Sequence, residues 1–251
     1  FLYDIGVVPC DEPYAKRTAQ GLILGPDGEK MSKSKGNVVD PNDVVDVYGA
    51  DVLRTYVLFM GDYASAAPWN ESSMKGCKRF LERIADLTDL VRPDGGSAKL
   101  ETSFHKTVKK VSEEIEELKF NTAIAAMMSL LNEIDEVGSL TREQISALVR
   151  LICPFAPHLA EEMWAALGGK GFCSLAPWPE WDDTKTVDST VEVAVQVNGT
   201  VRGTVSLPRH CPKEEAIALA KADPKIAAQL AGKTVIKEIS VPNKIVNLVV
   251  K

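Results

Sequence analysis

The chain has 251 residues, of which 45% are hydrophobic and 25% are charged, and its formal net charge is −6. This composition is typical of soluble globular domains, and the length is sufficient for two or three compact units. No stretch approaches the roughly 20 uncharged apolar residues that span a bilayer, so we expect no membrane segment. The chain begins with Phe1 inside what reads as a folded element, which indicates a fragment of a longer protein.

The first predicted elements are a strand, a loop and a helix. Residues 18–26 alternate in polarity and end in a Gly-Pro-Asp-Gly turn signal, which predicts a strand followed by an exposed, glycine-flanked loop over residues 30–37. A helix is then predicted to begin with Asp40 as its N-cap and Pro41 at its first position, where proline is favoured. Apolar residues at helical spacing predict that this helix continues without interruption to about Gly61.

A series of amphipathic segments follows and predicts a helical bundle. Asn70 and Asn121 are the expected N-caps of two of these helices, and Thr141 with Gln144 fits a capping box for a third. A short helix is predicted over residues 158–167. Because amphipathic helices joined by short connections bury their apolar stripes against one another, we expect an antiparallel bundle.

The next segment, residues 170–189, is rich in proline and shows no periodicity. It contains Trp178 and Trp181, large side chains that are costly to leave in water. We therefore expect a linker whose tryptophans pack onto the bundle.

The period then changes from helical to strand-like. Asn198-Gly199 lies between two alternating runs and is typical of a type I′ hairpin. A helical segment over residues 213–230, kinked near an Asp-Pro pair, precedes two further strand-like runs over residues 235–241 and 245–250. This pattern predicts a small ββαββ domain with one sheet and a helix covering one of its faces.

Charge is distributed unevenly along the chain. Residues 190–251 carry nine Lys/Arg and five Asp/Glu, whereas the remainder is acidic. RNA is recognised by shape, stacking and phosphate contacts, which suit a local basic surface. A solvated sheet face that keeps the domain soluble is the alternative interpretation. The candidate RNA-binding residues are Arg202, Lys237, Lys244 and Lys251.

The five cysteines are scattered, and no two form a C-x-x-C pair. This spacing argues against a zinc knuckle or a disulfide framework and favours free thiols in a reducing cytosol, so we expect a cytoplasmic location. Cys153 and His158 are near one another in the sequence, but a tetrahedral metal site needs about four ligands. We therefore predict no metal site.

The loop after the first strand has the composition of a polyphosphate clamp. Within the string at 30–34, two lysines supply positive charge and two hydroxyls supply hydrogen bonds, and the flanking glycines permit movement. The segment is not a P-loop, because G-x-x-x-x-G-K-[ST] is absent. An exposed basic loop without a role is the alternative. The residues concerned are Lys30, Met31, Ser32, Lys33 and Ser34.

The string K-M-S-K-S-K-G-N-V-V-D-P at 30–41, followed by Y-G-A-D-V-L-R at 48–54, resembles the second signature region of class I aminoacyl-tRNA synthetases. In that family the loop closes over ATP during amino-acid activation. The resemblance implies that Lys33 stabilises the pentavalent α-phosphate and the departing pyrophosphate, and that Lys30 contributes phosphate contact and loop position. It also implies Mg²⁺ accompanying ATP in the parent enzyme.

Two further polar groups are expected to be structural rather than catalytic. Asp51 and Arg54, in the helix that follows the loop, are predicted to pair with each other. His158 follows a proline at a helix start, and Glu161 and Glu162 are expected in the first turn, where the helix dipole favours negative charge.

The string C-P-F-A-P-H-L-A-E-E-M-W at 153–164 resembles the end of the helical anticodon-binding domain of the synthetases for leucine, isoleucine, valine, methionine and cysteine. V-Q-V-N-G-T-V-R-G at 195–203 and V-P-N-K-I-V-N-L-V-V at 241–250 resemble the C-terminal domain of bacterial leucyl-tRNA synthetases, which contacts the tRNA elbow. The implied partners are tRNA(Leu), ATP and leucine, and the implied parent is a monomeric leucine-tRNA ligase. A valine or isoleucine enzyme and a stand-alone tRNA-binding module are the alternatives.

The first class I signature, of H-x-G-H type, is missing, because His105, His158 and His210 are too far apart to form it. We therefore expect that the fragment alone binds tRNA but neither catalyses nor retains a cofactor. The expected organisation is a loop and stem-contact segment (1–68), a helical anticodon-binding-type bundle (69–169), a linker (170–189) and an α/β tRNA-binding domain (190–251).

Overall fold

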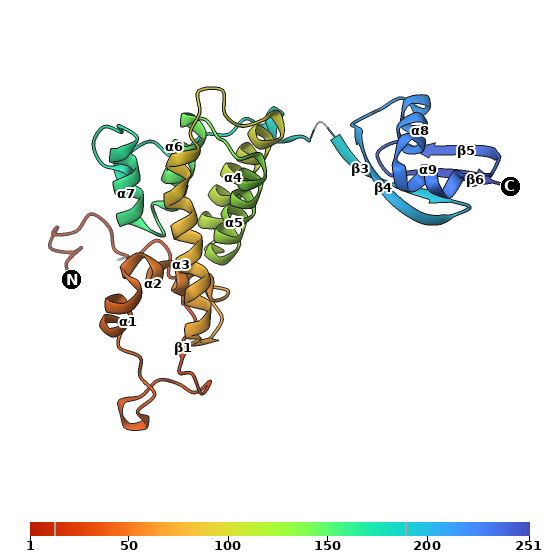
Figure 1. The fold of residues 1–251 in the computed structure, drawn as a ribbon. Coiled ribbons are helices and arrows are strands. Elements are labelled where there is room, and N and C mark those ends of the chain that lie inside the picture. The colour runs from red at the N-terminus through yellow and green to blue at the C-terminus, as the bar shows by residue number, and fades with distance from the viewer. Residues whose placement is uncertain (13, 189) are drawn as a thin grey trace. The chain divides into compact units, whose positions relative to one another are not determined.

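The computed structural model describes residues 1–12, 14–188 and 190–251 and divides into two compact units, Phe1–Trp181 and Asp182–Lys251 (Figure 1). The first unit is mainly helical and the second is a four-stranded sheet with two helices. The expected combination of a helical region with a small sheet region is confirmed. Within the described residues, no helix has the length and apolarity needed to cross a membrane.

The start of the first unit carries short elements around a loop. The parallel pairing of β1 with β2 ties the segment before the loop to the segment that leads into the bundle. Asp40 accepts a hydrogen bond from Asn42 N at 2.9 Å, so the predicted N-cap is confirmed. The elements are β1 (Ile23–Leu24), η1 (Lys33–Lys35), α1 (Pro41–Tyr48), α2 (Ala50–Phe59) and β2 (Ala67–Pro68).

The prediction of one uninterrupted helix after the loop is wrong. Gly49 has φ 89° and ψ 155°, a conformation that is essentially restricted to glycine, and it separates α1 from α2. The apolar spacing continues across this break because both helices bury residues against the same core, among them Val44 and Tyr56. Periodicity alone therefore did not reveal the change in direction.

The bundle follows. Asn70 accepts from Ser72 N, and the capping box of Thr141 and Gln144 is complete, so both predicted caps are confirmed. The predicted cap at Asn121 is wrong, because Leu118 turns the chain with φ 60° and the helix already begins at Phe120. The helices are α3 (Glu71–Asp86), α4 (Ala98–Glu116), α5 (Phe120–Val137), α6 (Arg142–Ile152) and α7 (Pro157–Ala166), with η2 (Leu87–Leu90) after α3.

One continuous apolar core holds the first unit together. It extends from the helices after the loop through α7, and α4 packs along α5. Burial of large apolar side chains contributes roughly 1.5–3 kcal/mol each relative to exposure, so this core dominates the stability of the unit. Its largest fully buried side chains include Tyr56, Met74, Ile84, Leu131, Ile134 and Phe155.

The segment after α7 is held to the bundle by polar contacts. Trp178 Nε1 donates to Ser112 Oγ at 2.7 Å, and Arg150 Nη1 donates to the carbonyl of Pro177 at 2.9 Å. The expected packing of Trp178 is therefore confirmed. This segment also contains η3 (Cys173–Leu175).

The second unit contains a sheet with strand order β4-β3-β6-β5, in which two antiparallel hairpins are joined by parallel pairing of β3 with β6. Asn198 and Gly199 have φ 51° and 79°, as a type I′ turn requires. The elements are η4 (Asp183–Thr186), β3 (Thr190–Val197), β4 (Thr200–Pro208), α8 (Lys213–Ala222), α9 (Pro224–Leu230), β5 (Val235–Val241) and β6 (Ile245–Val250).

Two helices, not one kinked helix, cover the sheet (Figure 1). Asp223 accepts from the backbone amides of Lys225 and Ile226, and Pro224 occupies the first position of α9, so this pair starts a new helix. The covered face carries Val195 and Val246, both fully buried.

Among the residues of this unit that the structure describes, none forms a helix on the other sheet face. On β5, Lys237, Ile239 and Val241 lie on that free face by strand register, whereas Glu238 lies on the covered face and pairs with Lys221 of α8. Two of the three β5 side chains on the free face, Ile239 and Val241, are therefore apolar, whereas a face that contacts only solvent is mainly polar.

Candidate functional site

The loop between β1 and α1 folds back on itself at its base. Gly25 N donates to the carbonyl of Glu29 at 2.8 Å, and Gly28 N donates to the carbonyl of Gly25 at 2.9 Å, with Gly28 at φ 75°. These contacts form the predicted turn. We refer to residues 25–37 as the Lys/Ser loop.

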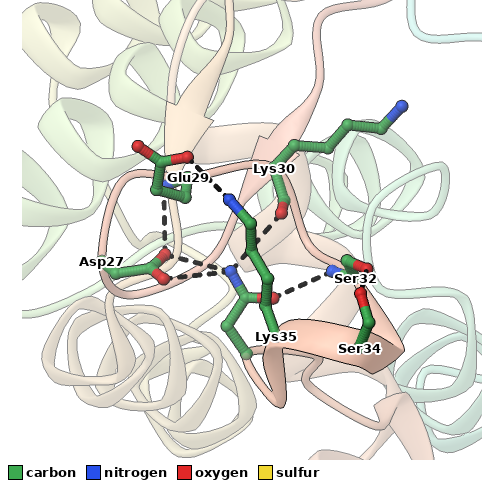
Figure 2. A network of polar contacts seen from close by, with 7 residues as sticks. Asp27, Glu29, Lys30, Ser32, Ser34 and Lys35 are labelled. Atoms are coloured by element: carbon green, nitrogen blue, oxygen red, sulfur yellow. Dashed lines mark hydrogen bonds and ion pairs between the residues drawn. The ribbon is translucent and has the colours of Figure 1, made fainter.

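A polar network closes this loop (Figure 2), and its hydrogen bonds meet at Asn37. Its Nδ2 donates to the two carboxylate oxygens of Asp27 at 3.2 and 3.0 Å and to the carbonyl of Lys30 at 3.4 Å. Its Oδ1 accepts from Ser32 N at 2.8 Å. Asp27 Oδ1 also accepts from Glu29 N at 3.0 Å. The backbone amide of Glu29 and the side chain of Asn37 together lower the pKa of Asp27 below its usual value, so the carboxylate is ionised at neutral pH.

The three lysines of the loop differ in their surroundings. Lys35 forms a 3.0 Å ion pair with Glu29. Lys30 and Lys33 are exposed and have no ionic partner among the residues that the structure describes, and Figure 2 shows the Lys30 side chain directed away from the network. Two ammonium groups of this loop are therefore exposed without a carboxylate partner among the described residues, which is a suitable arrangement for binding an anion.

The remaining residues of the candidate string have distinct environments. Ser32 Oγ and Ser34 Oγ share a hydrogen bond of 2.7 Å within the short turn η1. Met31 is half-buried and packs against the apolar core, so it anchors the loop to the first unit. The hydroxyls thus lie beside Lys33, while the methionine faces the protein.

Asp51 and Arg54 do not pair with each other, so that prediction is wrong. Asp51 lies 2.8 Å from His158 Nδ1 and accepts from Leu159 N at 2.8 Å, while Arg54 Nη2 donates to the carbonyl of Pro154 at 3.0 Å. The physical reason is that α7 has no side-chain cap of its own, and a carboxylate on α2 lies next to its free amides. Both residues therefore connect α2 with the start of α7.

The predicted placement of two carboxylates in the first turn of α7 is also wrong. The helix begins at Pro157, so Glu161 and Glu162 lie in its second turn. Glu161 accepts from Cys173 N at 2.6 Å and from Ser174 N at 3.0 Å. These two amides lower the pKa of Glu161, with the Ser174 amide contributing most. Its role is to hold η3 against the helix.

The cysteines are all free thiols, and three of them are buried. Burial raises the pKa of Cys77 to about 11 and that of Cys173 to about 12, so both are protonated at neutral pH. In residues 1–12, 14–188 and 190–251, no group of three or more His, Cys, Asp or Glu side chains is arranged to hold a metal ion.

The candidate RNA-binding residues of the second unit are all exposed but do not form one cluster. Arg202 lies on β4 beside a register shift, and Lys237 lies on β5, so these two occupy opposite outer strands. Lys251 follows β6, near the β3–β4 turn, whereas Lys244 lies in the β5–β6 turn at the other end of the sheet.

Sequence reasoning did not identify the polar network itself. Asp27, Glu29 and Asn37 lie outside the five-residue string, and nothing local indicates that Asp27 and Asn37 meet ten positions apart. The one residue in the sequence that could have indicated the network is Gly25. A Cβ at this position would lie 2.7 Å from Asp27 Oδ1 and 2.9 Å from Asn37 Nδ2, so the network occupies the space of a side chain.

Two family models match the chain. Residues 7–70 match the class I tRNA synthetases for I, L, M and V, and residues 98–217 match the anticodon-binding domain of tRNA ligases. A leucine–tRNA ligase of Alkaliphilus oremlandii is 46% identical over all of this chain and 31% of its own length, and one of Bdellovibrio bacteriovorus is 47% identical over all of this chain and 32% of its own. The chain thus spans about a third of the length of these relatives.

Solved structures are consistent with these matches. The ternary complex of Agrobacterium radiobacter K84 agnB2 LeuRS, tRNA and LeuAMS aligns with all of this chain and 35% of its own at a TM-score of 0.71 and 31% identity. Mycobacterium tuberculosis methionyl-tRNA synthetase with methionyl-adenylate aligns with 60% of this chain and 38% of its own, at a TM-score of 0.50 and 20% identity, which supports the fold alone. Over its whole length the chain is therefore homologous to leucine–tRNA ligases, and it contains a class I tRNA synthetase region and an anticodon-binding region.

Proposed function

We propose that this chain is the C-terminal part of a monomeric, cytoplasmic enzyme that adenylates leucine with ATP and transfers it to tRNA(Leu). The observation that carries the proposal is the pair of exposed, unneutralised lysines, Lys30 and Lys33, on an ordered loop of a chain homologous to leucine–tRNA ligases. The chain would supply the mobile ATP-site loop and the tRNA-binding regions. The remaining two thirds of the parent would supply the adenine and leucine sites.

The residues of the Lys/Ser loop fit a nucleotide triphosphate. Both nearby carboxylates are already engaged, Asp27 by the side chain of Asn37 and Glu29 by Lys35, so neither forms an ion pair with Lys30 or Lys33. Lys33 would stabilise the charge that develops on the α-phosphate and pyrophosphate, and Lys30 would contact phosphate and set the loop position. Ser32 and Ser34 would donate hydrogen bonds. Mg²⁺ would accompany ATP, held mainly by phosphates and water.

Replacement of Lys33 in the full-length protein tests this assignment. Lys33→Ala should lower kcat for leucine adenylation by about 10²–10³-fold, the scale of removing one preorganised donor, with little change in the leucine KM. Lys30→Ala should have a smaller effect, and hydrolysis of mischarged tRNA should be unchanged in both variants. Lys75→Ala removes the same charge from an exposed position of α3, outside the loop, and is the matched control. A normal kcat with a raised ATP KM in Lys33→Ala would contradict a role in the transition state.

We further propose four regions: a loop and stem-contact segment (1–68), an anticodon-binding-type bundle (69–169), a linker (170–189) and a ββαββ tRNA-binding domain (190–251). Residues 1–251 alone lack an H-x-G-H signature and should not activate leucine. ATP–pyrophosphate exchange with the purified chain measures this directly, and leucine-dependent exchange by the fragment would contradict the assignment.

The second unit is proposed to contact the tRNA elbow through Arg202, Lys237, Lys244 and Lys251. The support is their exposure and the helix-free sheet face beside Lys237, because RNA shape is read by stacking and phosphate contacts. Deletion of residues 190–251 from the full-length protein should preserve leucine adenylation and sharply reduce tRNA affinity and aminoacylation. Equal tRNA affinity with and without this unit at several salt concentrations would contradict the proposal.

Single substitutions refine this test. Each lost phosphate contact should reduce the slope of log affinity against log salt by about 0.7–0.9 units. Lys225→Ala is the matched control, because Lys225 is exposed on α9, which covers the opposite face of the sheet. A reduced slope for Arg202→Ala together with an unchanged slope for Lys225→Ala would identify Arg202 as a phosphate contact.

A further inference from the structure

The Lys/Ser loop is exposed and yet ordered by its own side chains. No residue of η1 is buried, so apart from the contact of Met31 with the core, apolar packing does not fix the position of Lys33. The hydrogen bonds between Asp27 and Asn37 close the loop across its base instead, and we refer to this contact as the loop latch. Glu29 and Lys35 form a second contact across the loop.

The latch is connected to both sides of the functional string. Asn37 accepts from the amide of Ser32 and donates to the carbonyl of Lys30, so a single side chain fixes the backbone on either side of Met31. Lys33 begins η1 directly after Ser32, and Gly36 ends it in the left-handed region at φ 66°. The spacing of the two free lysines therefore depends on Asn37.

Gly25 provides an independent sign that the latch is built into the fold. Its φ is not in the left-handed region, so backbone conformation does not demand glycine here. Glycine is required at this position because Asp27 Oδ1 and Asn37 Nδ2 lie within 3 Å of the position that a Cβ would occupy. Any larger residue at position 25 would displace the latch.

We infer that Asp27 and Asn37 are positioning residues, which hold Lys30 and Lys33 at a fixed spacing before the nucleotide arrives. This inference rests on the proposed function and extends it. A loop that is already folded moves as one body and does not lose conformational entropy at the moment of reaction. Its ammonium groups therefore stabilise the transition state without a cost for reorganising the loop. Lys35, despite lying in the same string of lysines, holds the loop and does not contact phosphate.

An exchange of the two side chains tests the latch in the full-length protein. Asn37→Asp places a second carboxylate against Asp27 and should lower kcat for adenylation about 10–100-fold, the cost of misplacing catalytic groups by about 1 Å, with an unchanged leucine KM. Asp27→Asn retains a hydrogen bond and should be milder. The double variant Asp27→Asn/Asn37→Asp restores an amide facing a carboxylate. It should be about tenfold more active than Asn37→Asp, a coupling that additive damage cannot give, although the carboxylate at position 37 no longer donates to the carbonyl of Lys30.

Controls separate the latch from the function on which it rests. Asp46→Asn makes the same substitution at an exposed position of α1 with no hydrogen-bond partner among the described residues, and it should be neutral. Thermal unfolding should be unchanged in every variant, because the loop buries little. A normal kcat for Asn37→Asp, or a double variant no more active than Asn37→Asp, would overturn the inference.

Lys33→Ala is assayed in parallel. If Lys33→Ala is fully active, the proposed function itself fails. If Lys33→Ala loses activity while Asn37→Asp does not, only the latch inference fails.

Discussion

The helical bundle and the Lys/Ser loop belong to the same compact unit but are ordered by opposite means. In the bundle, residues such as Leu131 and Ile134 are completely buried, and hydrophobic burial fixes the helices. In the loop, the ordering side chains are polar and lie at the surface, and hydrogen bonds from Asn37 fix the backbone.

This difference decides what a substitution changes in each region: the stability of the fold in the bundle, and the position of the lysines in the loop. A packed core tolerates apolar replacements of similar volume, because its stability is distributed over many contacts. A network with one central side chain has no such redundancy, although it contributes little to global stability. Substitutions in the bundle should therefore change the free energy of unfolding, and substitutions in the loop should change where the lysines lie.

The largest expected effect is in the core. Leu131→Ala should lower the free energy of unfolding by about 2–5 kcal/mol, because it leaves a cavity in a fully buried position. Urea unfolding of residues 1–251 followed by helical circular dichroism measures the change. Leu175→Ala is the control, since that side chain is 81% exposed, and a loss as large as that of Leu131→Ala would contradict the comparison.

An intermediate effect is expected at the contact between α2 and α7. Asp51→Ala should cost about 1–2 kcal/mol in the same unfolding experiment, the scale of losing a helix cap, because the amides of His158 and Leu159 lose their acceptor. Asp51→Asn keeps an acceptor oxygen and should recover most of the loss. Equal destabilisation by both variants would show that charge, not capping, is what matters there.

A smaller effect is expected for the ion pair in the loop. Glu29→Gln should change the free energy of unfolding by about 0–1 kcal/mol, because both partners are exposed and screened by solvent. The matched variant Glu12→Gln alters an exposed glutamate outside the loop. If Glu29→Gln lowered the free energy of unfolding as much as Leu131→Ala, the loop would contribute to the stability of the first unit as the apolar core does.

The smallest effect concerns the titration of Asp27. The pKa of Asp27 in the folded chain lies below the ordinary value of 3.8. The stability that its carboxylate contributes to the folded chain is therefore present above pH 3.8 and is lost as the pH falls through the lowered pKa. The latch should therefore be insensitive to pH near neutrality. Asn37→Ala should raise the pKa of Asp27 part of the way back, as measured by NMR titration of the two proteins under the same conditions. An unchanged pKa would show that the amide of Glu29 alone causes the shift.

Local signals in the sequence predicted local structure well. Asp40 with Pro41, the capping box at Thr141, and Asn198-Gly199 each act within a few residues, and all three are confirmed. The Lys30–Ser34 string likewise identified the candidate site because its residues are contiguous. Their functional roles remain predictions.

Contacts between distant positions could not be predicted in the same way. Asp51 meets His158 across 107 positions, and Asp27 meets Asn37 across ten, so only the folded chain reveals either partner. The break at Gly49 was also missed, because the helices on both sides keep the same apolar spacing. In each case the sequence shows the side chain but not the neighbour that decides its role.

The position of β6 between β3 and β5 has a consequence for how the second unit folds. Each hairpin joins neighbouring strands and can form within microseconds. The pairing of Ala194 with Ile245, in contrast, brings together segments separated by most of the unit, and such non-local pairing is slow. We therefore expect the two hairpins to appear early and their parallel docking along β3 and β6 to be the rate-limiting step of refolding.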